Sequence, residues 1–171
     1  MINKIKDNVW QLCFRLFGSC VYLIKLEKDN ILIDTGSSLN RDELTEDLKK
    51  LNIKFSEINI VLLTHNHFDH TDNLDFFKDA KIYGSKLEFP NKEIFDIHEL
   101  NINEFEIIDT PGHSKGSFCI LYQDILFSGD TIFHNSGIGR MDLEGGSELD
   151  MAKSLEKLKR INYKILCPGH L

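Results

Sequence analysis

One short segment constrains this chain more than any other: an apolar run that leads directly into a cluster of metal-binding side chains. Residues 58–63 read Ile-Asn-Ile-Val-Leu-Leu, which is typical of a short buried β-strand. The chain then continues into Thr64-His-Asn-His-Phe-Asp-His70. Such a His-x-His-x-Asp-His pattern would arise by chance in roughly one chain of this length per thousand. Four polar groups after a buried strand would otherwise lack compensation, so the segment predicts a metal site.

The remaining periodicity predicts strands in two blocks, each with helices outside it. We expect an antiparallel meander over residues 9–16, 20–26 and 31–33, and a helix over 41–51 with Asn40 available as its cap. Further strands are expected over 81–83, 105–108, 117–122, 125–127 and 165–167, and helices over 72–77 and 149–161, while residues 86–103 carry little pattern. The order favours an α/β fold, a four-layer αβ/βα sandwich of two mixed β-sheets flanked by helices, over a doubly wound parallel sheet.

Size and composition narrow the classes of protein. The chain has 171 residues, 42% of them hydrophobic, which predicts one domain over residues 1–171. A formal net charge of −7 disfavours nucleic-acid binding. No run approaches the ~18 apolar residues of a membrane span, so a cytoplasmic location is the default prediction. The four cysteines form no CxxC pair, and we expect reduced, mostly buried thiols.

Three more candidate ligands follow other predicted strands. His113 and His170 each end a Pro-Gly-His tripeptide, in which proline fixes a turn and glycine permits close backbone approach. Asp130 follows the strand at 125–127. Loops at strand ends can converge on a common site, so we expect these groups to join the histidine segment. His98 and His134 lack such context and are expected to be ordinary exposed side chains, although His134 could line the pocket.

The donor set indicates which metals would bind. Imidazole and carboxylate ligands without thiolate suit Zn²⁺, Fe²⁺ or Mn²⁺, and we favour two zinc ions, with iron or manganese as alternatives. The number of donors fits a dinuclear hydrolytic centre. The candidate metal ligands are His65, His67, Asp69, His70, His113, Asp130 and His170.

These residues, in this order, resemble the metallo-β-lactamase-fold superfamily. The matching motifs span nearly the whole chain: Ile33-Asp-Thr-Gly36, Thr64 to His70, Thr110-Pro-Gly-His-Ser114, Phe127-Ser-Gly-Asp-Thr131 and Pro168-Gly-His170. The resemblance implies one metal on His65, His67 and His113, a second on Asp69, His70 and His170, and Asp130 bridging them. We expect Asp34 and Thr131 to have supporting or structural roles, not catalytic ones.

Within the superfamily, Gly137-Ile-Gly-Arg-Met-Asp-Leu143 resembles the small single-domain relatives of glyoxalase II, the hydroxyacylglutathione hydrolases. This resemblance implies hydrolysis of a small-molecule thioester, or a similar activated ester, by a metal-bridging hydroxide. Asp69 would orient the hydroxide, Asp130 would complete the catalytic pair, and Arg140 would bind an anionic part of the substrate.

The resemblance also separates this chain from its neighbours in the superfamily. True β-lactamases carry Cys or Ser at the position of Asp130, and RNase Z enzymes have Gly at that of Phe68. Persulfide dioxygenases share the Gly-Arg-x-Asp pattern but use a single iron, and they are the main alternative. A metal-binding module with little catalytic activity is the second alternative.

Two departures from glyoxalase II affect the substrate site. Asp142 stands where glyoxalase II has a tyrosine. Glyoxalase II also has a separate C-terminal helical domain, which has no counterpart in this sequence. Relatives normally continue beyond the last histidine motif, whereas this chain ends one residue after His170. Either a terminal helix is missing, or a second subunit of a homo-oligomer covers that edge.

Overall fold

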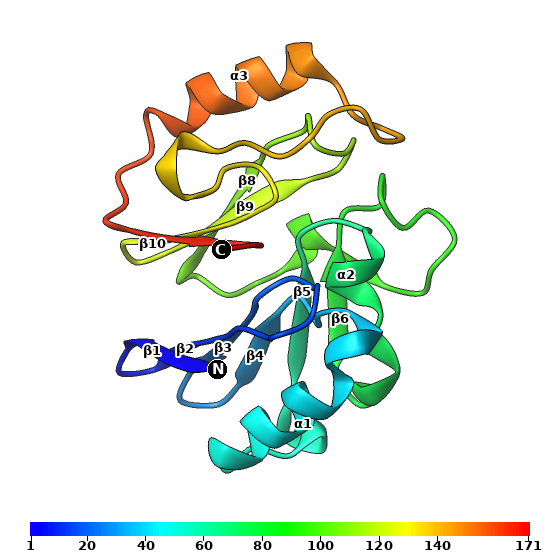
Figure 1. Ribbon diagram of the computed structural model, residues 1–171, viewed down its shortest axis with the longest axis vertical. Helices are drawn as coiled ribbons and strands as arrows, with labels where there is room; N and C mark the ends of the chain where they lie inside the picture. The colour runs from blue at the N-terminus through cyan, green and yellow to red at the C-terminus, as the bar shows by residue number, and fades with distance from the viewer. The chain divides into compact units, whose positions relative to one another are not determined.

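The computed structural model describes residues 1–171 and divides them into two compact units, Met1–Tyr83 and Gly84–Leu171 (Figure 1). Each unit is built around a mixed β-sheet. The chain is therefore an α/β protein with two mixed sheets and few helices, as the order of the predicted elements indicates. No helix is long and apolar enough to cross a membrane.

In the first unit, six strands lie in the order in which they occur in the sequence. They are β1 (Ile2–Lys6), β2 (Val9–Leu12), β3 (Val21–Lys25), β4 (Asn30–Ile33), β5 (Ile60–Leu63) and β6 (Lys81–Gly84). The pairs β2–β3 and β3–β4 are antiparallel, which confirms the predicted meander. Strand β5 runs parallel to β4, and all four of its residues are buried. The carboxyl ends of β4 and β5 therefore lie at the same edge of the sheet.

The helices of the first unit differ in detail from the prediction. Helix α1 (Arg41–Lys50) forms where expected and buries Leu44 and Leu48. Asn40 occupies its N-cap position, as predicted, but its side chain makes no capping hydrogen bond; its amide nitrogen donates to the carbonyl oxygen of Phe17. The predicted helix over 72–77 was wrong: α2 (Phe68–Thr71) ends before this segment, which forms only a 3-10 turn over Leu74–Phe76.

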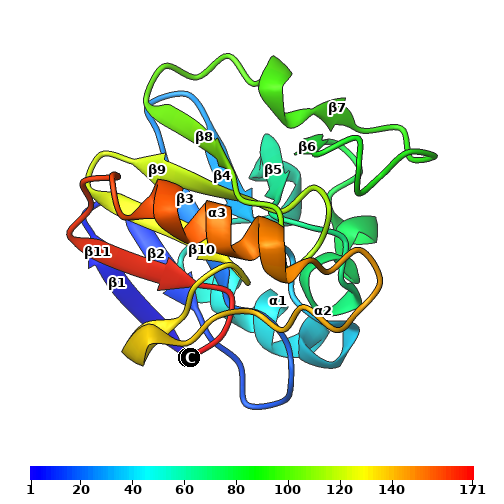
Figure 2. The same cartoon turned by 90° about the horizontal axis from the view of Figure 1, so that it is seen from above.

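The second unit contains β7 (Phe95–Asp96) and a four-stranded sheet in the order β11-β10-β9-β8. The strands of this four-stranded sheet are β8 (Phe105–Asp109), β9 (Phe118–Tyr122), β10 (Ile125–Gly129) and β11 (Ile165–Pro168). Helix α3 (Glu148–Leu158) lies across this sheet in both views (Figure 1 and Figure 2). Leu158 of α3 packs in a buried cluster with Ile108, Cys119 and Leu126, one from each of three strands.

Candidate metal centre

The histidine segment of the first unit begins directly after β5. His65 is 1% exposed, Asp69 6% and His70 is fully buried, while His67 is half-buried. Burial of polar groups is costly unless they have partners. A ring nitrogen of His65 lies 3.0 Å from one of His67, and His70 contacts Asp34. Within this unit, the four side chains lie on the segment that directly follows β5.

Asp34, at the end of β4, organises this segment. Its carboxylate accepts from Nδ1 of His70 at 2.7 Å, from the backbone N–H of Thr64 at 2.8 Å and from the Thr64 hydroxyl at 2.9 Å. The residue is 2% exposed and has a φ of 58°, a conformation that aspartate and asparagine tolerate better than most residues. The parallel β4–β5 pair brings Asp34 beside Thr64, so the sheet itself sets this arrangement.

These hydrogen bonds fix the protonation of the rings. Because a carboxylate can only accept, Nδ1 of His70 carries the proton and Nε2 presents its lone pair. The Thr64 hydroxyl donates to Asp34, so it accepts from Nδ1 of His65 at 3.0 Å. His65 therefore also presents Nε2. A metal ligand oriented through its other ring nitrogen is the usual arrangement for histidine.

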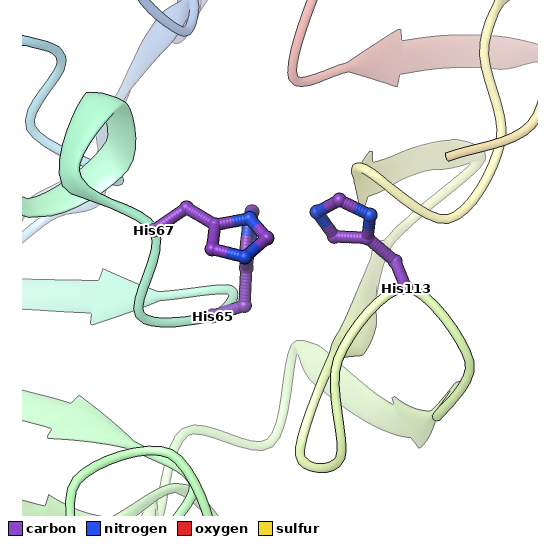
Figure 3. A group of neighbouring side chains, drawn as sticks. All are labelled: His65, His67 and His113. Atoms are coloured by element: carbon purple, nitrogen blue, oxygen red, sulfur yellow. The ribbon is translucent and has the colours of Figure 1, made fainter. Parts of the chain in front are cut away.

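His67 differs from His65 and His70, because its Nδ1 atom and not its Nε2 atom lies close to a neighbouring histidine. Nδ1 of His67 lies 3.0 Å from Nε2 of His65, and Figure 3 shows both side chains on the segment that follows β5. Two nitrogens bound to one tetrahedral zinc at 2.0–2.1 Å are about 3.3 Å apart. The spacing of this pair thus fits two ligands of a single ion.

In the second unit, three strands deliver the remaining candidates to one edge of the sheet. Strands β8 and β10 are both antiparallel to β9, and β11 is parallel to β10, so β8, β10 and β11 point the same way. His113, Asp130 and His170 follow these three strands in turn. The Oδ2 atom of Asp130 lies 3.6 Å from Nε2 of His113 and 3.4 Å from Nε2 of His170.

Both spacings suit ligand atoms that share a metal ion. Nδ1 of His113, whose side chain Figure 3 also draws, donates to the carbonyl oxygen of Arg140 at 2.7 Å, which leaves Nε2 as the ligand atom. The hydroxyls of Thr110 and Thr131, both fully buried, are 2.9 Å apart and link the loops after β8 and β10. Thr131 therefore supports the loops, as the sequence indicates.

The donors fit divalent metals on chemical grounds. All seven are nitrogen or oxygen atoms, and none is a thiolate. Three of the histidines have a ring nitrogen already committed to a hydrogen-bond acceptor, so their other nitrogens are the basic atoms that a metal requires. This oriented donor set suits Zn²⁺, Fe²⁺ or Mn²⁺ better than Ca²⁺ or Mg²⁺, which prefer oxygen.

Gly112 sets the position of His113. It has a φ of 145°, and a Cβ atom there would lie 2.5 Å from the backbone of Met151 in α3. The predicted close approach in this Pro-Gly-His turn is thus confirmed. In the other tripeptide, the Gly169 amide donates to the Gly129 carbonyl at 2.7 Å.

Substitution of Gly112 is expected to perturb the second unit strongly. We expect Gly112→Ala to lower the stability by about 2–4 kcal/mol, since both the backbone angle and the contact with α3 become unfavourable. Gly137→Ala is the matched control, because a Cβ atom there would meet no backbone closer than 3.4 Å. Thermal unfolding of the two variants would measure this difference. Equal melting temperatures would contradict the role given to Gly112.

The candidate substrate-binding residue has a partner of its own. The Arg140 guanidinium forms a bidentate ion pair with Asp142 through two contacts of 2.7 Å, and both side chains are more than 60% exposed. These hydrogen bonds lower the pKa of Asp142 to about 2. His98 and His134 are exposed, as predicted, and His98 pairs with Asp109 at 3.1 Å.

Sequence reasoning missed two groups that orient ligands. One is the Thr64 hydroxyl between His65 and Asp34, and the other is the backbone carbonyl of Arg140. Thr64 precedes the first histidine directly, which is a signal that the sequence offers. A carbonyl partner leaves no signal in the sequence, because every residue has one.

A comparison with models of protein families shows to which family the chain belongs. The family model described as the metallo-beta-lactamase superfamily matches residues 15–88 and 86–170. The chain belongs to this superfamily. A probable metallo-hydrolase of Methanocaldococcus jannaschii is 37% identical, over 90% of this chain and 88% of that protein.

Two further relatives carry more specific names. A probable polyketide biosynthesis zinc-dependent hydrolase of Bacillus subtilis is 28% identical over 87% of this chain and 71% of its own length. Hydroxyacylglutathione hydrolase 1 of Vibrio vulnificus is 30% identical over 87% of this chain, but the match spans only 60% of that protein. Membership of the superfamily and these names together support a metal-dependent hydrolase.

Solved structures show the same fold. A metallo-beta-lactamase family protein from Thermus thermophilus has a TM-score of 0.84 at 18% identity, over 98% of this chain and 75% of that one. ETHE1 from Myxococcus xanthus has a TM-score of 0.76 at 26% identity, over 94% of this chain and 74% of that one. The predicted fold class is therefore confirmed as that of the metallo-β-lactamase superfamily.

Proposed function

We propose that the chain is a dinuclear metal-dependent hydrolase that cleaves a small-molecule thioester or a similar activated ester. The observation that carries the proposal is the position of Asp130, whose Oδ2 atom lies 3.6 Å from Nε2 of His113 and 3.4 Å from Nε2 of His170. A carboxylate oxygen close to two histidine nitrogens could act as the ligand that two ions share.

The ligand sets that we propose are those that the resemblance to the superfamily implies. His65, His67 and His113 would bind one ion, and Asp69, His70 and His170 the other, with Asp130 bridging them. When bound, such ions lower the pKa of a water molecule to ~7 and polarise a substrate carbonyl. Zinc is our first choice, because it takes imidazole and carboxylate ligands and has no redox chemistry.

The chain's own residues would position the reactants. Asp69 would accept a hydrogen bond from the attacking water and so direct its lone pair toward the carbonyl carbon. Asp34 and Thr64 would keep His65 and His70 in the tautomers that leave Nε2 basic. The burial of these groups excludes bulk water from the ligands, which strengthens each electrostatic contact.

The test is hydrolysis of S-D-lactoylglutathione and a panel of other thioesters in the absence of oxygen. We expect hydrolysis that chelation abolishes and added divalent metal restores. A metal-loaded protein that cleaves no thioester, lactone or phosphodiester would contradict the proposal and favour the metal-binding module.

A persulfide dioxygenase is the second candidate, because residues 139–142 read Gly-Arg-Met-Asp. That chemistry would use one iron on His65, His113 and Asp130, so His170 would be dispensable. Retention of oxygen consumption with glutathione persulfide in His170→Ala would favour the dioxygenase. Loss of thioester hydrolysis in the same variant would favour the hydrolase.

Arg140 provides a test of substrate recognition. We propose that its guanidinium exchanges Asp142 for an anionic group of the substrate, because a planar pair of donors matches a carboxylate. Arg140→Ala is expected to raise KM for an anionic thioester about tenfold with little change in kcat, since one charged hydrogen bond contributes about 1.5–3 kcal/mol. Arg160→Ala, an exposed arginine after α3, is the control. Equal KM values for the two variants would remove Arg140 from the binding site.

A further inference from the structure

Two cysteines in the first unit face each other across the β2–β3 pair. The register pairs Leu12 with Val21, so the next residues outward, Cys13 and Cys20, are opposite one another. Directly opposite residues in an antiparallel pair have Cα atoms about 4.5–5.5 Å apart, which lies within the range that a disulfide spans. Their Sγ atoms are 3.2 Å apart, so little movement is needed to join them.

The two thiols differ in a way that suits sequential oxidation. Cys13 is half-buried, whereas Cys20 is 5% exposed. The hydrogen bond from the Cys20 thiol lowers the pKa of Cys13, against the opposing effect of partial burial. Cys13 is therefore the more accessible thiol, and its lowered pKa favours the thiolate; exposure and thiolate character govern the rate of oxidation.

We propose that Cys13 and Cys20 form a peroxide-oxidisable dithiol that closes reversibly to a disulfide. The Cys13 thiolate attacks the O–O bond of a hydroperoxide, gives Cys13 sulfenic acid and releases an alcohol or water. The Cys20 sulfur then attacks the Cys13 sulfur, and its own proton leaves with the departing hydroxide as water. In total, the two thiols lose two electrons and the peroxide gains two. A thiol reductant then regenerates the two thiols from the disulfide by thiol–disulfide exchange.

The other two cysteines lack these properties. Cys119 is completely buried in the sheet of the second unit, and burial raises its pKa to about 11. Cys167 is 1% exposed. Buried thiols of this kind react slowly, so oxidation is expected to select the Cys13–Cys20 pair.

The loop that this disulfide would close contacts the metal-binding segment. Residues 14–19 connect the two cysteines, and the Ser19 amide donates to the Asp69 carbonyl at 3.1 Å. The ring of Phe17 lies 6.1 Å from that of Phe68, which stands between His67 and Asp69. Oxidation would therefore tie the ends of a loop that adjoins the candidate metal ligands.

The test treats the folded, reduced protein with stoichiometric hydrogen peroxide, followed by alkylation and tryptic digestion without reductant. Cleavage after Arg15 places Cys13 in peptide 7–15 and Cys20 in peptide 16–25, so a disulfide appears as two joined peptides. We expect this joined species, its loss on addition of dithiothreitol, and oxidation of Cys13 at least ten times faster than that of Cys119.

Variants separate the two chemical steps. Cys20→Ser is expected to stop at the sulfenic acid of Cys13, which a cyclic 1,3-dione would trap, and Cys119→Ser is the matched control that should still form the joined peptides. Absence of the joined peptides in the parent protein, with Cys13 unmodified or oxidised beyond the sulfenic acid, would overturn the proposal. Neither result depends on hydrolytic activity.

Discussion

Replacing Asp130 with alanine is expected to lower kcat/KM for thioester hydrolysis by at least about 10³-fold. The reason is that one carboxylate oxygen lies 3.6 Å from His113 and 3.4 Å from His170, where it would serve both ions. Its removal would cost several kcal/mol of transition-state stabilisation, and each 1.36 kcal/mol corresponds to a factor of ten in rate. Steady-state kinetics with S-D-lactoylglutathione, together with elemental analysis, would measure the effect.

The control for Asp130→Ala is Asp109→Asn. Asp109 is also in the second unit, but its side chain is 58% exposed and contacts His98, not a candidate ligand. It should retain the activity of the parent. If Asp130→Ala kept comparable activity, a bridging role for Asp130 would be ruled out.

Replacing Asp34 with asparagine is expected to weaken metal binding by about 10–100-fold, although Asp34 itself binds no metal. Its carboxylate accepts from His70 and Thr64, and through the Thr64 hydroxyl it also orients His65. An amide has one acceptor oxygen and no charge, so it cannot maintain all of these bonds, and loss of such partners typically reduces affinity by this factor. Asparagine tolerates the positive φ at this position, which keeps backbone strain out of the comparison.

Competition with a chromophoric chelator would measure the affinity of the Asp34→Asn protein. Asp72→Asn is the matched control: Asp72 lies in the same unit and accepts from Ser38, but it contacts no histidine. Equal affinities for the two variants would show that Asp34 does not orient the ligands.

The strands were predictable where their pattern and their burial coincide. The run at residues 58–63 contains β5, and the strands after residue 104 lie within one or two residues of the prediction. The expected strand over 9–16 ends at Leu12, and the chain bends over residues 15–18, which leaves Leu16 and Phe17 exposed. Strand β1 was missed, since its five residues are only partly buried and pair at one edge of the sheet.

The candidate ligands were predictable because their chemistry is concentrated at strand ends. The direction of β8, β10 and β11 then explains why His113, Asp130 and His170 gather in one unit. What could not be predicted are groups without a sequence signal, such as the Arg140 carbonyl beside His113. The pairing of Arg140 with Asp142 was equally hidden, because two oppositely charged exposed residues form many alternative contacts.

The measurement that tests the central claim most directly is the metal content of the purified protein, determined by elemental analysis alongside that of His170→Ala. We expect two divalent ions per chain in the parent protein. In His170→Ala we expect one, because the second ion loses a ligand while His65, His67 and His113 remain. A single iron per chain in both proteins would contradict the dinuclear hydrolase and support the dioxygenase, and no bound metal in either would contradict both.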